Sequence, residues 1–299
     1  MLLIARETRL SPHTFAARSG NIFAVFDERT QDSGNVSYGV TAGDQRYFIK
    51  TAGSESSVHS LPIEERVALL RNAIRLNRSV THRILPSLRN VIESGDGPIL
   101  VYDWVDGELL GVAAEHRSDP ASAYFRFRRL PVREVLNVLD AIIDLHDHLA
   151  SNGWIAVDFY DGSIIYDFLT GTTHVVDLDS YHFGAFVNRV GRLFGSTRFM
   201  APEEFQLGAE ITERTNVFML GRAVFELLSE DVDGAFRGPP ELLALAQHAC
   251  CLAPDDRFAS VRQFSAAWAV ARSSTGARQP QANKACEAAS RYHERVETG

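Results

Sequence analysis

The chain has 299 residues, of which 45% are hydrophobic and 23% charged, an ordinary balance for a globular protein that buries a sizeable core. Its formal net charge of -8 offers no basic field, so we expect neither nucleic acid nor anionic lipid as a partner. The cysteines Cys250, Cys251 and Cys286 form no plausible disulfide framework. The first five residues are too short for a signal-peptide core, and no apolar run reaches membrane length. These features predict a cytoplasmic protein and leave its oligomeric state open.

The first third of the chain predicts a small antiparallel sheet with one main helix. Its strands are expected at 21–26, 36–40, 47–50, 88–92 and 99–104. Between 62 and 79 the apolar residues recur at helical spacing, with a proline and two glutamates at the start. This part therefore predicts a meander of short strands that packs against a helix.

The remainder of the chain predicts mainly helices. Apolar periodicity places them at about 132–151, 216–228, 240–251 and 260–271. After Arg272 the composition shifts to polar and charged residues, which favours disorder or a short helix at 283–296. We therefore predict an α+β protein with two lobes. Its parts are an N-terminal extension (1–19), a sheet-bearing lobe (20–105), a larger helical lobe (106–271) and a polar tail (272–299).

The most informative stretch is Gly195–Glu203, which ends in Ala-Pro-Glu. It begins about forty residues after Asp158 and eighteen residues after Asp177. In this order and spacing the three elements resemble the C-lobe of a protein kinase. The resemblance is to bacterial serine/threonine protein kinases and covers roughly residues 20–271. It implies a bilobal protein-kinase-like fold, with a small antiparallel β-sheet N-lobe and a larger helical C-lobe, that binds ATP and Mg²⁺.

Lys50 ends one of the predicted strands, after a glycine-containing hairpin and before a helix. In this setting it resembles the kinase lysine that holds the α- and β-phosphates of ATP, whereas a lone lysine at a strand end is usually solvated. Gly34 and Val36 match the last glycine and the valine of the kinase Gly-rich loop. Arg29 and Gln31 occupy the other two glycine positions, so the phosphate cradle is expected to be looser.

The resemblance also requires a helix glutamate that pairs with the lysine. Its expected position falls near Asn72 or Ala73, neither of which can form the ion pair. Glu65, one or two turns earlier, would reach Lys50 if the helix is displaced. The alternative is that Glu64 and Glu65 only favour the start of the helix.

Residues 100–108 resemble the kinase hinge, with Tyr102 as the gatekeeper. By this resemblance the backbone groups of Asp103 and Val105 would bind the adenine edge. Glu108 would contact the ribose. Without the resemblance, the same stretch is a buried strand followed by a turn.

Asp158 matches the kinase aspartate that orients the attacking hydroxyl and accepts its proton. The surrounding loop departs from the family pattern. Alanine and valine at 156–157 replace histidine and arginine, and Tyr160 stands where a lysine steadies the γ-phosphate. Ser163 replaces an asparagine that binds the second metal ion, and its hydroxyl is a weaker Mg²⁺ ligand. Asp161 is an additional acid, which either helps to bind metal or makes a turn with the following glycine.

Asp177 follows a predicted strand and matches the aspartate of the Asp-Phe-Gly motif. The resemblance implies that it binds Mg²⁺ between the β- and γ-phosphates. Asp179 replaces the glycine of the motif, so a second carboxylate is a candidate metal ligand. The alternative is an exposed loop that carries two acids.

Further matches are structural. Glu203 is expected to form a buried ion pair with Arg257, and Asn216 replaces the acid that braces the catalytic loop. Ser196 matches the threonine that contacts the catalytic residues of Ser/Thr kinases. Aminoglycoside-type phosphotransferases lack the Ala-Pro-Glu segment and these downstream helices.

The sequence therefore predicts phosphoryl transfer from ATP to a Ser or Thr hydroxyl of a protein. Two alternatives stay open. The loss of helper groups is also typical of a pseudokinase, a nucleotide-binding scaffold that regulates a protein partner. A small-molecule phosphotransferase is the other alternative.

Overall fold

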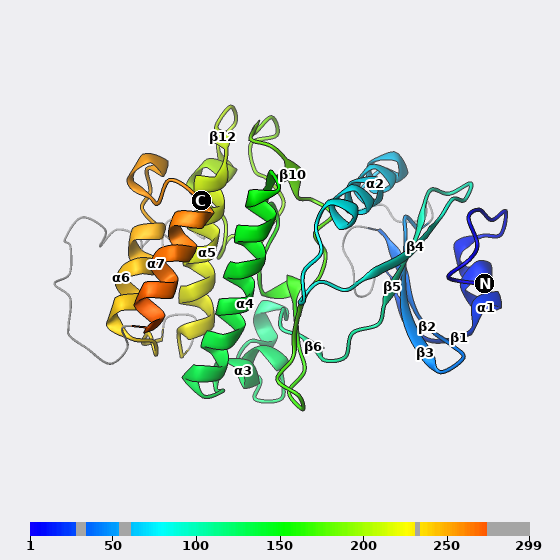
Figure 1. Cartoon of the computed structure of the whole chain (residues 1–299), viewed down its shortest axis with the longest axis horizontal. Helices are drawn as coiled ribbons and strands as arrows, with labels where there is room; N and C mark the ends of the chain where they lie inside the picture. The colour runs from blue at the N-terminus through cyan, green and yellow to red at the C-terminus, as the bar shows by residue number, and fades with distance from the viewer. Residues whose placement is uncertain (28–33, 54–60, 231–233, 274–299) are drawn as a thin grey trace. The chain divides into compact units, whose positions relative to one another are not determined.

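The computed structural model describes residues 1–27, 34–53, 61–230 and 234–273 (Figure 1). The chain is α+β and divides into two compact units, Met1–Asp106 (unit 1) and Gly107–Gly299 (unit 2). This border lies one residue after the position expected from the sequence. The expected short helix in the tail and the loop residues Arg29 and Gln31 fall outside the described residues. Among the described residues, none of the helices has both the length and the apolar composition that a membrane span requires.

Unit 1 contains a five-stranded antiparallel sheet with the order β1-β2-β3-β5-β4. The strands are β1 (Asn21–Phe26), β2 (Val36–Ala42), β3 (Gln45–Thr51), β4 (Leu88–Ile92) and β5 (Ile99–Asp103). Each predicted strand segment forms, because its backbone pairs with the adjacent strand or strands and its apolar side chains pack into the clusters on the faces of the sheet. The β2–β3 hairpin turns at Gly43, whose φ of 63° favours glycine.

The two faces of this sheet are covered by different helices. On one face, helix α1 (Pro12–Ser19) packs on a cluster that contains Phe15, Tyr38, Val40, Ile49 and Val101. On the other face, helix α2 (Ile63–Ser79) buries a cluster of Ala52, Leu70, Ala73, Ile74 and Leu100. Because side chains alternate along a strand, Lys50 lies on the α2 face, paired across the sheet with Ser37 and Leu100.

The first nineteen residues belong to unit 1 and include helix α1, which the sequence analysis did not predict. Ser11 caps this helix by accepting a hydrogen bond from the Thr14 N–H at 3.3 Å, and Pro12 occupies the first turn. Before the helix, Glu7 and Glu93 form a parallel bridge, and the Thr8 N–H donates to the Glu93 carbonyl at 2.8 Å. The extension therefore covers one face and one edge of the sheet.

Unit 2 is mainly helical. Its helices are α3 (Ala123–Arg128), α4 (Val132–Ser151), α5 (Glu213–Leu228), α6 (Pro240–Ala249) and α7 (Val261–Ser273). Short 3-10 helices are η1 (Ala114–His116), η2 (Asp161–Ser163), η3 (Pro202–Phe205) and η4 (Pro254–Asp256). Helices α4 to α7 pack on one another (Figure 1). Their apolar faces form the core expected from the 3.6-residue periodicity.

Small sheets shape the rest of unit 2. A three-stranded sheet contains β6 (Glu108–Leu109), β8 (Ile164–Tyr166) and β9 (Thr173–Val175). Two further pairs join β7 (Trp154–Ile155) to β10 (His182–Phe183) and β11 (Phe186–Val187) to β12 (Glu210–Ile211). These pairings hold the loop at 153–163 and the segment at 177–203 beside the helices.

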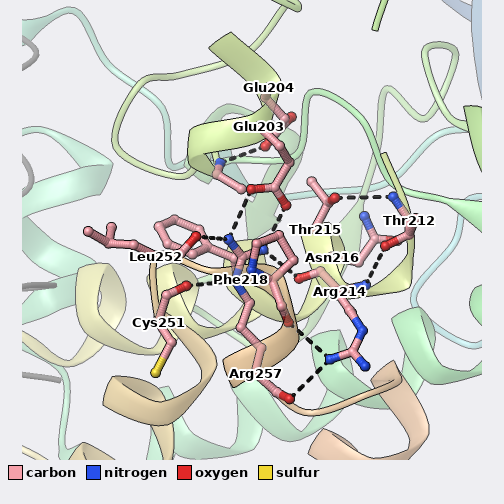
Figure 2. Close-up of polar contacts among 12 residues, drawn as sticks. Glu203, Glu204, Thr212, Arg214, Thr215, Asn216, Phe218, Cys251, Leu252 and Arg257 are labelled. Atoms are coloured by element: carbon pink, nitrogen blue, oxygen red, sulfur yellow. Dashed lines mark hydrogen bonds and ion pairs between the residues drawn. The ribbon is translucent and has the colours of Figure 1, made fainter. Parts of the chain in front are cut away.

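The ion pair expected between Glu203 and Arg257 is present (Figure 2). The Arg257 Nη1 and Nη2 atoms donate to the two carboxylate oxygens of Glu203 at 2.7 and 2.9 Å. The guanidinium also donates to backbone carbonyls, including those of Cys251 at 2.7 Å and Leu252 at 3.0 Å. Both side chains are almost fully buried, so this pair fixes η3 to the loop that precedes α7.

Removing one partner of this pair should be costly, because the other charge would remain buried without compensation. We expect Glu203→Ala to lower the free energy of unfolding by roughly 3–5 kcal/mol in urea denaturation. The matched control is Glu210→Ala, which removes an exposed acid on β12 and should change little. Equal denaturation midpoints for the two variants would contradict a stabilising role for the pair.

Candidate functional site

Two aspartates of unit 2 adopt an unusual backbone conformation. Asp158 and Asp177 have φ values of 65° and 62°, and they are the non-glycine residues of the described chain with positive φ. This conformation costs about 1–3 kcal/mol and is concentrated at functional sites. These are the two residues that the sequence pattern predicts as the catalytic and metal-binding acids.

The charges of the two aspartates interact. Burial and, next, the charge of Asp177 raise the pKa of Asp158 to about 7, while the charge of Arg192 lowers it. Asp177 is exposed, whereas Asp158 is half-buried. Carboxylates that crowd one another favour a divalent cation, and oxygen ligands suit Mg²⁺. The donor chemistry of this pair therefore fits a magnesium ion bound at Asp177.

The other two expected metal ligands are less accessible. Ser163 is buried, with its hydroxyl 3.5 Å from the Asp158 carbonyl oxygen, and its own carbonyl accepts from the Val176 N–H at 2.9 Å. Asp179 is also buried. Within the described residues no group of three His, Cys, Asp or Glu side chains could hold a metal ion. A bound ion would thus depend on Asp177, with further oxygens from Ser163, water and the phosphates.

Asp161, for which metal binding and a turn were both considered, has a different partner. It begins η2, and both its carboxylate oxygens accept from the Arg198 Nη2 atom, at 2.8 and 2.6 Å. Its side chain is almost fully buried. The structure therefore agrees with the turn, and the ion pair occupies the oxygens that a metal would need.

The ion pair is part of a buried network that we call the Arg198 network (Arg198, Asp161, Glu226 and Arg222). Arg198 donates through Nη1 to Glu226 at 2.9 Å, and Arg222 donates through Nη2 to the other oxygen of Glu226 at 2.9 Å. The Nε atom of Arg222 also donates to the carbonyl of Arg198 at 2.7 Å. The network joins the loop at 153–163, the segment at 195–203 and helix α5.

Asn216 of α5 braces the same loop from another side. Its Oδ1 atom accepts from the Ala156 N–H at 2.8 Å, and its Nδ2 atom donates to the Ala156 carbonyl at 2.8 Å. A carboxylate at this position could accept but could not donate. Asparagine thus replaces the expected acid without loss of the bracing contact, which the sequence analysis did not foresee.

A buried histidine and tyrosine form a hydrogen-bonded pair near the two aspartates, and the sequence pattern did not indicate this pair. His146 Nδ1 lies 2.8 Å from the Ile142 carbonyl oxygen, and its Nε2 lies 2.9 Å from the Tyr181 hydroxyl. The carbonyl can only accept, so Nδ1 carries the proton and Nε2 accepts from the tyrosine. Burial, followed by the charges of Asp158 and Asp177, raises the pKa of Tyr181, which keeps its hydroxyl protonated.

Glu204 is a second buried acid near Asp158. Its Oε2 atom accepts from the Ala201 N–H at 2.7 Å (Figure 2). Burial, and to a smaller extent the charges of Glu203 and Asp158, raises the pKa of Glu204 to about 8, against the lowering effects of that hydrogen bond and of Arg257. Glu204 is therefore largely protonated at neutral pH.

In unit 1 the structure separates two of the expected phosphate-binding residues. Lys50 is buried on the α2 face, whereas Val36 packs on the cluster of the opposite face. The cross-strand neighbour of Lys50 on its own face is Ser37. Val36 therefore does not share a surface with Lys50, because the register places the two on opposite sides of the pleat.

Glu65 does not form the expected pair with Lys50. It is exposed and forms no ion pair with any residue that the structure describes. Its neighbour Arg66 is buried instead and donates through Nη1 to the carbonyls of Gly34, at 2.6 Å, and Ala52. An arginine thus fixes the start of α2 to the turn before β2 and to the end of β3. Gly34 itself has a φ of 81°, which favours glycine.

The expected hinge residues of unit 1 are engaged in local contacts. Tyr102 packs on the α2 cluster, and its hydroxyl accepts from Asn77 Nδ2 at 3.3 Å. The Asp103 N–H, one of the backbone groups expected to bind adenine, donates instead to the Ser87 carbonyl at 3.0 Å. Val105 is half-buried.

Glu108, the expected ribose contact, belongs to unit 2 and pairs with Arg126. Its two carboxylate oxygens accept from the Arg126 guanidinium at 2.7 and 3.1 Å. The arginine also stacks over the Phe168 ring at 4.0 Å. A ribose contact would have to compete with this exposed ion pair.

An aromatic cluster on the sheet was not recognised from the sequence. Phe23 lies 4.8 Å from Trp104 between ring centroids, and Phe26 lies 5.8 Å from Phe48. A Cβ atom at Gly39 would come within 2.7 Å of Phe23 and 3.0 Å of Trp104, so glycine is required there. Phe48 and Gly39 lie on the same face as Lys50. Aromatic rings there offer a surface on which a flat base can stack.

Compared with known proteins, the chain matches no family model and no curated sequence. Functional assignment therefore rests on the residues and contacts described above.

The Arg198 network should control the order of the loop that carries Asp158. We expect Asp161→Asn to destabilise the fold and to raise amide hydrogen exchange at 156–163 and 195–203, because Arg198 loses its charged partner there. Asp256→Asn, which neutralises an exposed aspartate of η4, is the control. Unchanged exchange at both stretches in Asp161→Asn would show that the network does not hold them.

Glu204 should make stability depend on pH. The folded protein keeps a proton on Glu204 where the unfolded chain, with a pKa of about 4.3, has lost it. Stability linked to Glu204 is therefore full below about pH 4 and falls as pH rises to about 8, by at most about 1.4 kcal/mol per pH unit. Glu204→Gln should remove this loss, so its advantage in urea midpoint should grow from pH 5 to pH 8. Parallel pH profiles for variant and wild type would contradict a buried neutral Glu204.

Proposed function

We propose that this chain is a divergent serine/threonine protein kinase that transfers the γ-phosphoryl group of ATP to a Ser or Thr hydroxyl of a protein. The observation that carries the proposal is the pair Asp158 and Asp177, two mutually interacting carboxylates held with left-handed backbones in unit 2. The Arg198 network and Asn216 support it, because they fix the loop that carries Asp158. We further propose a cytoplasmic location and a protein as the acceptor or regulated partner.

In this proposal each residue has a separate role. Asp158 orients the acceptor hydroxyl and takes its proton, and a pKa near 7 suits a group that exchanges protons at neutral pH. Asp177, with help from Ser163, holds Mg²⁺, which when bound neutralises charge on the phosphates. Lys50 binds the α- and β-phosphates. Phosphoryl transfer depends mainly on positioning and charge, so a site that retains these groups can remain active.

A pseudokinase is the second candidate, and specific observations favour it. Glu65 pairs with no described residue, and Glu108 is occupied by Arg126. Phe48 and the rings near it occupy the Lys50 face of the sheet. Such a site could bind a nucleotide by stacking and signal to a protein partner without transfer. A small-molecule acceptor is the remaining alternative.

The two aspartates should respond differently to neutralisation. Asp177→Asn removes a metal ligand and should weaken the Mg²⁺-dependent part of ATP binding. Asp158→Asn keeps the shape of the side chain, so ATP binding should survive while transfer falls by about 10²–10⁴-fold. Thermal-shift titration with ATP, with and without Mg²⁺, and a labelled phosphate-transfer assay measure the two effects.

The same titration with Lys50→Ala tests the proposed phosphate-binding residue of unit 1. If Lys50 binds phosphates, Lys50→Ala should weaken ATP much more than adenosine, since only ATP presents the charge. Binding by the wild type without transfer to itself or to any offered protein would favour the pseudokinase. Absence of both binding and transfer would refute both nucleotide-dependent functions.

A further inference from the structure

The proposed site brings several acidic residues to the place where a phosphoryl group would be transferred. Asp158, Asp177 and Asp179 all belong to it, and the three equatorial oxygens of the transferring group add further charge. Tyr160 occupies the position from which a lysine would act. The Tyr160 ring packs closely against Gly162 of the same loop. A Cβ atom at Gly162 would be only 2.2 Å from Tyr160 Cε2. Tyr160 carries no positive charge, so a cation for the γ-phosphoryl group, in addition to Lys50 and a bound metal ion, would have to come from another residue.

Arg192 is positioned to supply it. The residue is exposed, and its guanidinium is held by its own segment. Nη2 donates to the Gly195 carbonyl at 3.0 Å and to Thr197 Oγ1 at 3.3 Å, and Nη1 donates to the Leu193 carbonyl at 3.2 Å. A Cβ atom at Gly195 would lie 3.7 Å from the Asp158 Cα, so the guanidinium is attached to the backbone that adjoins Asp158. Its charge also lowers the pKa of Asp158.

Arg192 differs from the buried arginines of unit 2 in what it can still bind. Arg198 and Arg257 are neutralised by buried carboxylates at 2.6–2.9 Å. Arg192 forms no ion pair with a described carboxylate, and its three hydrogen bonds leave two of the five guanidinium N–H groups without a partner in the described chain. A guanidinium with donors available binds phosphate oxygens well.

We propose that Arg192 is a catalytic residue that binds the γ-phosphoryl group of ATP and neutralises its charge during transfer. This inference rests on the proposed function. The acceptor hydroxyl oxygen forms a bond to the γ-phosphorus while the bond from that phosphorus to the β–γ bridging oxygen breaks. The proton of the hydroxyl goes to Asp158, and the electron pair of the broken bond leaves with ADP. Arg192 thus performs the charge-stabilising role for which Tyr160 is unsuited.

The test compares Arg192→Gln with Arg189→Gln, which neutralises an exposed arginine three residues earlier. We expect Arg192→Gln to lower kcat by about 10²–10³-fold and to weaken MgATP more than MgADP, because ADP lacks the γ-phosphoryl group. Arg192→Lys, which keeps the charge, should recover part of both losses. Arg189→Gln should match the wild type in kcat and in the ratio of the two affinities.

The ratio of MgATP to MgADP affinity separates this role from a structural one, since a distorted segment would weaken both nucleotides alike. If the wild type transfers phosphate and Arg192→Gln keeps both kcat and the affinity ratio, Arg192 is not catalytic and the proposed function stands. Equal weakening of both nucleotides would likewise overturn the inference. If the wild type binds neither nucleotide, the proposed function fails and the role of Arg192 fails with it.

Discussion

The candidate site depends on one buried cation, Arg198, which lies between the carboxylates of Asp161 and Glu226. Buried charges are tolerated only when each is paired and hydrogen-bonded. Asp161 belongs to the loop that carries Asp158, and Glu226 belongs to helix α5, so the pairing requirement fixes the loop against the helical core. Burial alone would not specify this arrangement. The geometry of the ion pairs does, because Asp161 without Arg198 would be a buried charge with no other ion-pair partner among the described residues, whereas Glu226 also pairs with Arg222.

The same constraint explains how Asp158 can keep a left-handed backbone. A strained conformation persists only where the surroundings over-determine it. Around Asp158 they do: Asn216 holds the backbone of Ala156 on one side, and Arg198 holds Asp161 on the other. The buried His146–Tyr181 hydrogen bond lies nearby, where burial and then the charges of both aspartates raise the pKa of Tyr181. Directional hydrogen bonds and an ion pair on both sides of Asp158 thus maintain the strained backbone conformation.

Much of the fold could be predicted from the sequence, because strand alternation and helical periodicity are local signals. The strand at Asn21–Phe26 and the helix at Val132–Ser151 have the expected limits. Helix α1 was missed although Ser11 and Pro12 are typical start signals, since its eight residues show little periodicity. In the candidate site, Asp158 and Asp177 could be selected by order and spacing. The partner of Asp161 could not, because Arg198 follows it by 37 residues and only tertiary packing brings them together.

The absence of a motif residue therefore does not show that the contact it would make is lost. At position 216 an amide replaces an acid, yet it grips the Ala156 backbone through both a donor and an acceptor. At the start of α2 no glutamate pair forms, yet Arg66 ties the helix to the carbonyls of Gly34 and Ala52. In both places a buried side chain holds backbone segments together although the residue expected from the motif is missing. Such a site requires a defined attachment between its backbone segments and a defined charge facing the substrate. Several residue types can provide the attachment.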